Sequence, residues 1–203
     1  MIKTGVTVND LFYISEKIYK DVFVAENKIT QEKYFISEIK SNECKKTLQI
    51  LKGVRHPFLP EIHDIFSCEG KEYYRTSFIE GQTLSELIKS SGAALSCEKL
   101  CRYMAQVSRI IQLLHSQFKT SIFHLEIQTD TIIISDKNTV HLLNYGCSGD
   151  KINKDYEIMS KLPETANNGE CSVKSDIFMI GETLHSILKP GFSKITFNDT
   201  CFN

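Results

Sequence analysis

The pattern of apolar residues changes once along the chain, close to Gly81, and this change restricts the folds that the sequence can adopt. Residues 11–40 are rich in Val, Ile, Phe and Tyr, and the polar stretch 26–33 divides them as a hairpin turn would. A helix and two more strands are predicted before Gly81, at residues 42–53, 61–67 and 72–79. The first part of the chain is therefore predicted to be a small antiparallel sheet with one helix.

After Gly81 the spacing of apolar residues is mostly helical. Helices are predicted at residues 83–90, 97–116 and 175–188. Two short strands are predicted at residues 132–135 and 140–143. A sheet followed by a mostly helical region is an α+β plan of two lobes. We place the first lobe at residues 1–80 and the second at 81–203.

The charge and the apolar content indicate an intracellular chain without a general affinity for polyanions. The net charge is −1 and the pI is about 6.6, so we expect no nucleic-acid or membrane partner. No signal-peptide run or membrane-length apolar stretch occurs, which predicts a cytoplasmic location. Cys97 and Cys101 share a helical face, but no further ligand completes a metal site, so we expect ordinary reduced thiols.

Seven segments, in order, resemble those of eukaryotic-type protein kinases. They are HPFLPEIHDIF (56–66), FIEGQTLSELI (78–88), LLHS (113–116), IFHLEIQTDTIII (122–134), LLNYG (142–146), LPE (162–164) and KSDIFMIGETLHSIL (174–188). The resemblance implies a two-lobed kinase-like domain. It also implies a truncated large lobe, because the family's last helices would follow Asn203.

The positions that hold nucleotide in this family carry other residues here. Ser15, Lys17 and Lys20 fall at the three positions of the glycine-rich loop, where a side chain obstructs the phosphates. The phosphate-binding lysine of the third strand falls on Ser37, and its glutamate partner falls on Thr47. The ion pair that marks an assembled kinase site is therefore not expected to form.

The catalytic and metal-binding positions are also altered. The catalytic aspartate falls on Glu126, and the lysine beside it on Gln128. The two magnesium ligands fall on Thr131 and Asn144, neither of which is a carboxylate. We therefore expect no metal site and no required cofactor, and ATP, if it binds at all, to bind weakly and without magnesium.

The positions that shape the scaffold are kept. His124 and Gly146 match loop-forming residues, and Pro163 and Glu164 match the anchor of the activation segment. Asp176 matches the aspartate that holds the backbone of the catalytic loop. The sequence thus resembles a kinase whose framework is better preserved than its chemistry.

The leading hypothesis at this point is a catalytically inactive pseudokinase that binds a protein as a regulator or scaffold. An active kinase or a second copy of the chain is the expected partner. The alternative is a weak or atypical ATP-dependent serine/threonine kinase using Lys20 and Glu126, because some active kinases supply their lysine from the glycine-rich loop. A decaying gene product is a third interpretation, and in both non-enzymatic interpretations Lys20 is an ordinary solvated lysine.

Two expectations concern surfaces. We predict that the side chains of Ser15, Lys17 and Lys20 narrow the nucleotide cleft, with Asn144 facing it. We also predict an apolar surface along the helix at 175–188, unless residues 189–203 fold back to cover it.

Overall fold

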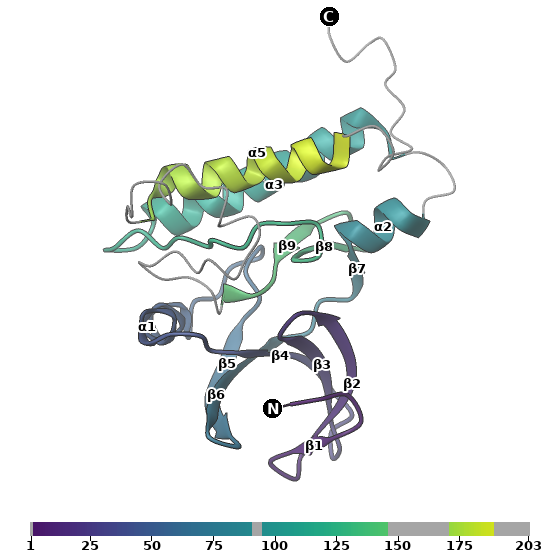
Figure 1. The fold of residues 1–203 in the computed structure, drawn as a ribbon, viewed down its shortest axis with the longest axis vertical. Coiled ribbons are helices and arrows are strands. Elements are labelled where there is room, and N and C mark those ends of the chain that lie inside the picture. The colour runs from purple at the N-terminus through teal and green to yellow at the C-terminus, as the bar shows by residue number, and fades with distance from the viewer. Residues whose placement is uncertain (1, 91–94, 146–170, 189–203) are drawn as a thin grey trace, which may run out of the picture.

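Antiparallel strands form the first lobe, in a six-stranded sheet with the spatial order β1-β2-β3-β4-β6-β5. The computed structural model describes residues 2–90, 95–145 and 171–188. The strands are β1 (Thr7–Val8), β2 (Phe12–Tyr19), β3 (Val22–Asn27), β4 (Lys33–Glu38), β5 (Ile62–Cys68) and β6 (Lys71–Ser77). Figure 1 shows that this sheet is curled and that it lies at the opposite end of the molecule from helices α3 and α5.

Helix α1 (Asn42–Leu51) is the helix of the first lobe. The Oγ atom of Ser41 accepts a hydrogen bond from the backbone N–H of Cys44 (3.0 Å), which satisfies one of the free donors at the start of the helix. Cys44, Leu48 and Leu51 are buried on one side of the helix and join the main apolar core. The amphipathic pattern of the sequence therefore decides which face of α1 turns inward.

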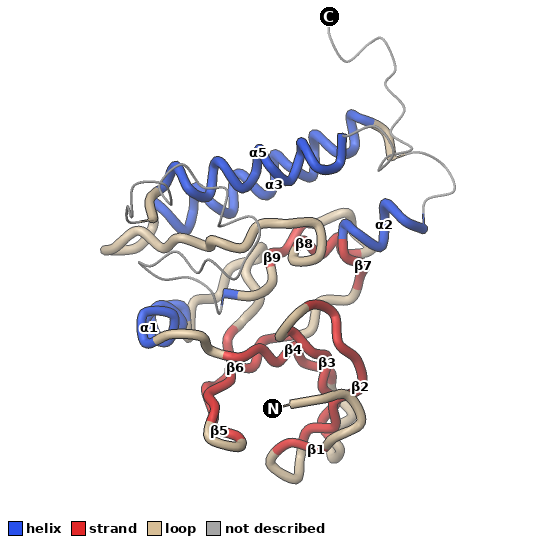
Figure 2. Tube along the Cα trace, viewed as in Figure 1, coloured by secondary structure: helices blue, strands red, loops and turns tan. Residues whose placement is uncertain are grey.

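The second lobe combines a small sheet with three described helices. Its elements are β7 (Gly81–Thr83), α2 (Leu84–Ser90), α3 (Cys97–Ser116), β8 (Ile132–Ser135), β9 (Val140–Leu142) and α5 (Val173–Leu188). The sheet order is β7-β8-β9, and α3 and α5 lie side by side above it (Figures 1 and 2). No helix among the described residues is long and apolar enough to cross a bilayer.

Gly81 occupies the point where the chain passes from one lobe to the other. Its φ of 156° is a backbone conformation that residues with side chains rarely adopt. A Cβ atom at this position would lie 2.2 Å from the carbonyl oxygen of Ile134, which belongs to the paired strand β8. Only glycine therefore allows β7 to pair closely with β8 at this point.

A third apolar cluster joins the two lobes. Val22, Val24 and Phe35 from the first sheet pack with Ile133 and Leu143 from the second lobe. Phe35 is 3% exposed. The relative position of the lobes is thus fixed by direct packing, in addition to the chain connection at Gly81.

The predicted α+β plan is confirmed, with one local error. Residues 11–40 form three strands rather than the predicted two, because the chain also turns sharply between Tyr19 and Val22. This turn contains neither Gly nor Pro, and its single turn-favouring residue, Asp21, is a weak signal on its own. On α5, Ile177 (59%) and Leu188 (42%) are exposed; residues 189–203, which were the alternative cover for this surface, lie outside the described part of the chain.

The packing between the lobes leads to a stability prediction. Phe35→Ala should lower the free energy of unfolding by about 3–5 kcal/mol, because it removes a buried ring from the cluster that joins the lobes. Ile29→Ala, at an 81% exposed position, should change it by less than about 0.5 kcal/mol. Urea denaturation measures both values, and equal effects of the two substitutions would contradict this account of the interface.

Candidate functional site

The segment that contains Glu126 is held by a buried carboxylate on α5. Asp176 is fully buried and accepts hydrogen bonds from the backbone N–H groups of His124 (3.0 Å) and Leu125 (2.8 Å). His115 on α3 approaches the same carboxylate, with 2.8 Å between its Nε2 and Asp176 Oδ2. Asp176 therefore holds the catalytic-loop backbone, as the sequence predicted.

His124 is part of this support rather than a catalytic base. Its ring is completely buried against Tyr145, with 5.0 Å between the ring centroids, and its Nδ1 accepts the backbone N–H of Glu126 (3.3 Å). Burial lowers the pKa of His124 from 6.5 to about 4, although the nearby Asp176 carboxylate opposes the shift. The imidazole is therefore neutral at pH 7, which is the structural role expected for it.

Glu126 is surrounded by hydrogen-bond donors. The residue is 4% exposed, and its Oε2 accepts a hydrogen bond from the amide Nδ2 of Asn144. Oε1 accepts from Nε2 of Gln128 (3.2 Å). Two neutral amides thus fix both oxygens of a carboxylate that is almost excluded from water, which orients it without neutralising its charge.

Lys20 reaches this carboxylate from the other lobe. It lies in the turn between β2 and β3, and its Nζ is 3.9 Å from Oε1 of Glu126. The neighbouring Tyr19 hydroxyl accepts a hydrogen bond from Nε2 of Gln128 (2.6 Å). The tip of the loop that carries glycines in other kinases therefore contacts the catalytic loop here. Lys20 is thus more than a solvated surface lysine.

The positions of the missing lysine–glutamate pair are occupied differently. Ser37 on β4 is 2% exposed, at the inner end of the cleft. Thr47 lines a separate surface groove with Ser121 and Phe123, away from Ser37. On the same helix as Thr47, the Sγ of Cys44 contacts the carbonyl oxygen of Tyr145 (3.5 Å).

Two further side chains, Cys44 and Lys40, do not replace the missing ion pair. Burial raises the pKa of the Cys44 thiol to about 12, so that thiol is not a nucleophile at neutral pH. Lys40, the other lysine near β4, pairs with Asp21 (2.6 Å) and Glu38 (3.6 Å). Lys40 is thus committed to carboxylates outside the site.

The polar groups at the two magnesium positions are hydrogen-bonded within the site. The hydroxyl of Thr131 is buried and donates to the backbone carbonyl of Glu126 (2.6 Å). The amide of Asn144 uses its N–H on Glu126. Within residues 2–90, 95–145 and 171–188, no group of three or more His, Cys, Asp or Glu residues is placed to hold a metal ion.

An open cavity of about 400 Å³ lies at the mouth of the cleft, next to the connection between the lobes. Its apolar walls come from both lobes and include Ile18, Val24, Phe35, Phe78 and Ile133. The rings of Phe35 and Phe78 are 5.0 Å apart. A flat heteroaromatic base of the size of adenine fits the dimensions and the character of this space.

The prediction about the cleft needs a correction. Ser15 donates to the carbonyl of Val24 (3.3 Å), and Lys17 lies over the ring of Phe23 (5.7 Å); both side chains are exposed. Both contacts are to β3, so these two residues stay on the first lobe. The register of β2 on β3 shifts between Lys17 and Tyr19, which changes the direction of the side chains that follow. Tyr19 and Lys20, which are in or next to the turn, are the residues that reach across.

Some scaffold positions cannot be compared. Gly146, Pro163 and Glu164 lie outside the described residues.

The two lobes, the connection at Gly81 and the catalytic loop held by Asp176 together define a protein kinase domain. A family model described as protein tyrosine and serine/threonine kinase matches residues 15–199, and the chain belongs to this family. The resemblance inferred from the sequence is therefore confirmed.

Relatives among curated proteins carry names that agree with this family. The chain is 26% identical over 200 residues to "Probable serine/threonine-protein kinase YbdM" of Bacillus subtilis, covering 92% of this chain and 73% of that protein. It is 25% identical over 149 residues to a Dictyostelium discoideum protein also named as a probable serine/threonine-protein kinase, covering 69% of this chain and 32% of that protein. For "Probable serine/threonine-protein kinase PknB" of Lactococcus lactis the identity is 25% over 141 residues, with 66% and 22% covered.

These relatives overturn the leading hypothesis of the sequence. The interpretation as an inactive pseudokinase with a scaffold role is wrong, because the chain belongs to the kinase family and the relatives named above are serine/threonine kinases by name. That hypothesis gave more weight to the absent carboxylates than to Lys20 as a replacement for the missing lysine. The findings agree better with the alternative that uses Lys20 and Glu126.

The burial of His124 gives a pH prediction. Below pH 6.5 the unfolded chain takes up a proton that the folded chain refuses until about pH 4. The free energy of unfolding should therefore fall as the pH falls through this window, by about 3 kcal/mol from this group. His124→Gln should flatten the dependence, whereas His185→Gln, at an exposed position, should not. Denaturant titrations from pH 7 to pH 4 that showed the same slope for His124→Gln and the unaltered chain would refute the prediction.

Proposed function

We propose that the chain is an atypical ATP-dependent serine/threonine protein kinase in which Lys20 holds the phosphates and Glu126 is the general base. The observation that carries the proposal is the approach of Lys20 Nζ to within 3.9 Å of Glu126 Oε1 across the cleft. A cation from the phosphate-binding loop and a carboxylate from the catalytic loop are thereby brought to one point. The names of the relatives support the choice of reaction and of acceptor.

The nucleotide would enter by the cavity at the mouth of the cleft. The base would lie between Val24 and Ile133, and the phosphates would extend toward the turn that carries Tyr19 and Lys20. The inner end of the cleft, beside Ser37, is filled by side chains, so the phosphates cannot follow the usual route along β4. Lys20 keeps 39% of its side chain exposed and can exchange its carboxylate partner for a phosphate.

That exchange would also prepare the base. When Lys20 moves to the phosphates, Oε1 of Glu126 loses this cation and, while still accepting from Gln128, can accept the proton of a serine or threonine hydroxyl. The hydroxyl oxygen then forms a bond to the γ-phosphorus, the bond to the bridging oxygen breaks, and ADP leaves. Gln128 and Asn144 hold the carboxylate in place during these steps, so they are positioning residues.

Magnesium, which this family normally uses, does not fit the residues present. Of its two usual ligand positions, Asn144 has its amide turned to Glu126 and Thr131 has its hydroxyl turned to the backbone. No step of the proposal therefore goes through the metal. The charge of the transferred group would be balanced by the ammonium of Lys20.

Phosphate transfer from γ-labelled ATP to a mixed protein substrate tests the proposal. Lys20→Met removes the phosphate cation and Glu126→Gln removes the base, so each should lower the initial rate by at least about 100-fold. Lys40→Met is the matched control, because Lys40 is held by Asp21 outside the cleft, and it should leave the rate unchanged.

Two results would contradict the proposal. One is a transfer rate that both Lys20→Met and Glu126→Gln leave unchanged, and the other is the absence of any transfer by a chain that is folded by circular dichroism. Chelation by EDTA separates the proposed chemistry from the usual one, because the rate should persist without magnesium. Acid hydrolysis of the product should give phosphoserine or phosphothreonine.

A further inference from the structure

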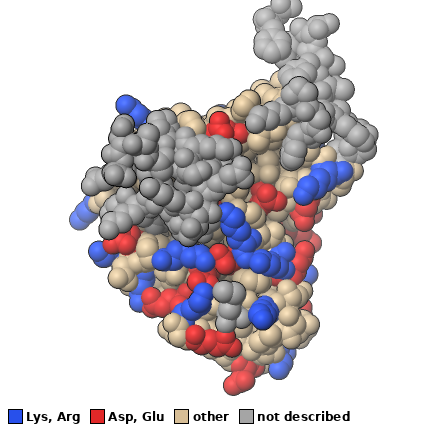
Figure 3. Space-filling view, viewed as in Figure 1, with Lys and Arg blue, Asp and Glu red and all other residues tan. Residues whose placement is uncertain are grey.

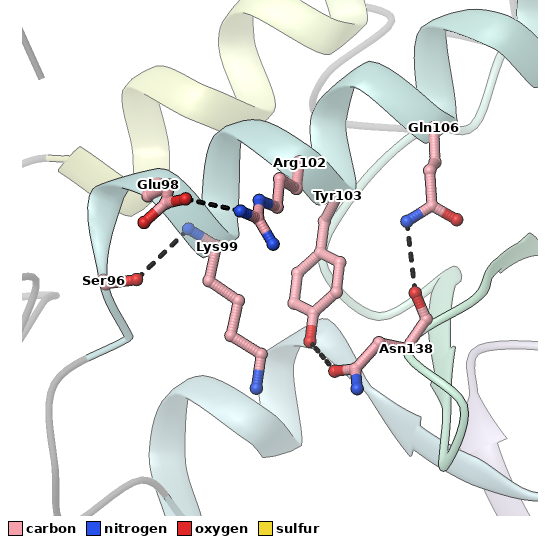
Figure 4. A pocket seen from close by; sticks show the side chains of 7 residues that line it. All are labelled: Ser96, Glu98, Lys99, Arg102, Tyr103, Gln106 and Asn138. Carbon is pink, nitrogen blue, oxygen red and sulfur yellow. Dashed lines mark hydrogen bonds and ion pairs between the residues drawn. The ribbon is translucent and has the colours of Figure 1, made fainter.

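A second cavity, of about 500 Å³, lies between the first turns of α3 and the turn that joins β8 to β9. Figure 4 shows its main lining residues, among them Lys99, Arg102, Tyr103 and Asn138. None of them belongs to the site that contains Glu126. The kinase proposal therefore leaves this cavity without a role.

The floor of the cavity is fixed by hydrogen bonds. The hydroxyl of Tyr103 donates to Oδ1 of Asn138 (2.7 Å), and Nε2 of Gln106 donates to the backbone carbonyl of Asn138 (3.1 Å). Gln106 in turn accepts the backbone N–H of Val140 through its Oε1 (3.1 Å). Because Oδ1 is occupied by Tyr103, the amide of Asn138 is held in one orientation and its Nδ2 hydrogens remain available as donors.

The charged groups of the cavity are two cations, Lys99 and Arg102, and one carboxylate, Glu98. Arg102 holds the carboxylate of Glu98 (2.6 Å), so that the acidic group of the cavity is already compensated. The Nζ of Lys99 lies 5.8 Å from the centre of the Tyr103 ring. In Figure 4 the side chains of Lys99 and Asn138 extend on either side of the Tyr103 hydroxyl. The cavity thus offers a rigid amide donor beside an aromatic surface and the ammonium of Lys99, which forms no ion pair with the part of the chain that the structure describes.

We propose that this cavity binds a carboxylate side chain of an acidic peptide segment, and that a protein substrate docks there. The substrate role rests on the proposed kinase function, whereas the binding itself does not. A carboxylate is the group that matches an ammonium and an amide N–H pair at one point. Such a contact would hold a substrate to the second lobe while its hydroxyl reaches Glu126.

The openness of the cavity favours a peptide over a small molecule. The rim side chains of Arg102 and Glu98 are 73% and 67% exposed. A small ligand would remain largely in water there, whereas small-molecule sites usually bury most of their ligand. A peptide can place one acidic side chain in the cavity and continue along the surface.

Binding would depend on the cavity and not on the charge of the whole chain. The net charge is −1, and Figure 3 shows basic and acidic side chains interspersed over one face. A general attraction for anions is therefore absent, and long-range steering would be weak at physiological salt. A change of charge at Lys99 should consequently alter the affinity for an acidic peptide, whereas the same change of charge outside the cavity should not.

Fluorescence anisotropy of the full chain with fluorescein-labelled hexaglutamate tests the proposal, with hexaglutamine as the reference peptide. Hexaglutamate should bind, and Lys99→Glu should weaken it by at least about tenfold. Asn138→Asp should weaken it as well, since it keeps the acceptor for Tyr103 but replaces the donor by a negative charge. Lys119→Glu makes the same change of charge beyond the other end of α3 and should leave the affinity unchanged.

Equal losses for Lys99→Glu and Lys119→Glu, or no preference for hexaglutamate over hexaglutamine, would overturn the docking site. The assay contains no nucleotide, so its outcome is independent of catalysis. If the chain transfers phosphate, a substrate with a glutamate-rich extension should show a raised KM and an unchanged kcat with Lys99→Glu. Intact peptide binding together with an absence of transfer would reject the kinase function and leave the docking site standing.

Discussion

The buried carboxylate of Asp176 is the interaction on which the rest of the site depends. It accepts two consecutive backbone N–H groups, from His124 and Leu125, and thereby holds Leu125 at a φ of 59°, a conformation uncommon for a residue with a branched side chain. Removing the carboxylate would leave these donors buried and unsatisfied. Because Glu126 directly follows Leu125, the direction of its side chain depends on Asp176 of helix α5, which is far from it in the sequence.

The cleft follows from this arrangement and from the short turn after β2. Glu126 is fixed from its own lobe by Gln128 and Asn144, and it meets Lys20 from the other lobe. The apolar cluster around Phe35 sets the distance between the lobes, so the lysine spans it without further closure. A nucleotide would therefore compete with the carboxylate of Glu126 for the ammonium of Lys20.

The sequence predicted the framework better than the chemistry. The bounds of α3 follow from its regular apolar spacing and from Ser96, whose hydroxyl accepts the backbone N–H of Lys99 at the start of the helix (3.2 Å). The role of Asp176 followed from the order of the motifs. The turn at Lys20 lacks Gly and Pro and has Asp21 as its one turn-favouring residue. The contact of Lys20 with Glu126 depends on the spacing of the lobes, which no local pattern encodes. The pseudokinase interpretation failed at this point, since it counted absent residues without knowing which neighbours stand beside those that remain.

Labelling with an ATP acyl phosphate tests the central claim most directly. In this reagent an acyl group is attached to the terminal phosphate, and the amine of a lysine beside the phosphates attacks the acyl carbon to form an amide and release ATP. Mass spectrometry of the digested chain then identifies the lysine. The account predicts modification at Lys20, suppressed by excess ATP, with Lys17 and Lys40 unlabelled. Labelling of Lys40 in place of Lys20, or labelling that ATP does not suppress, would contradict it.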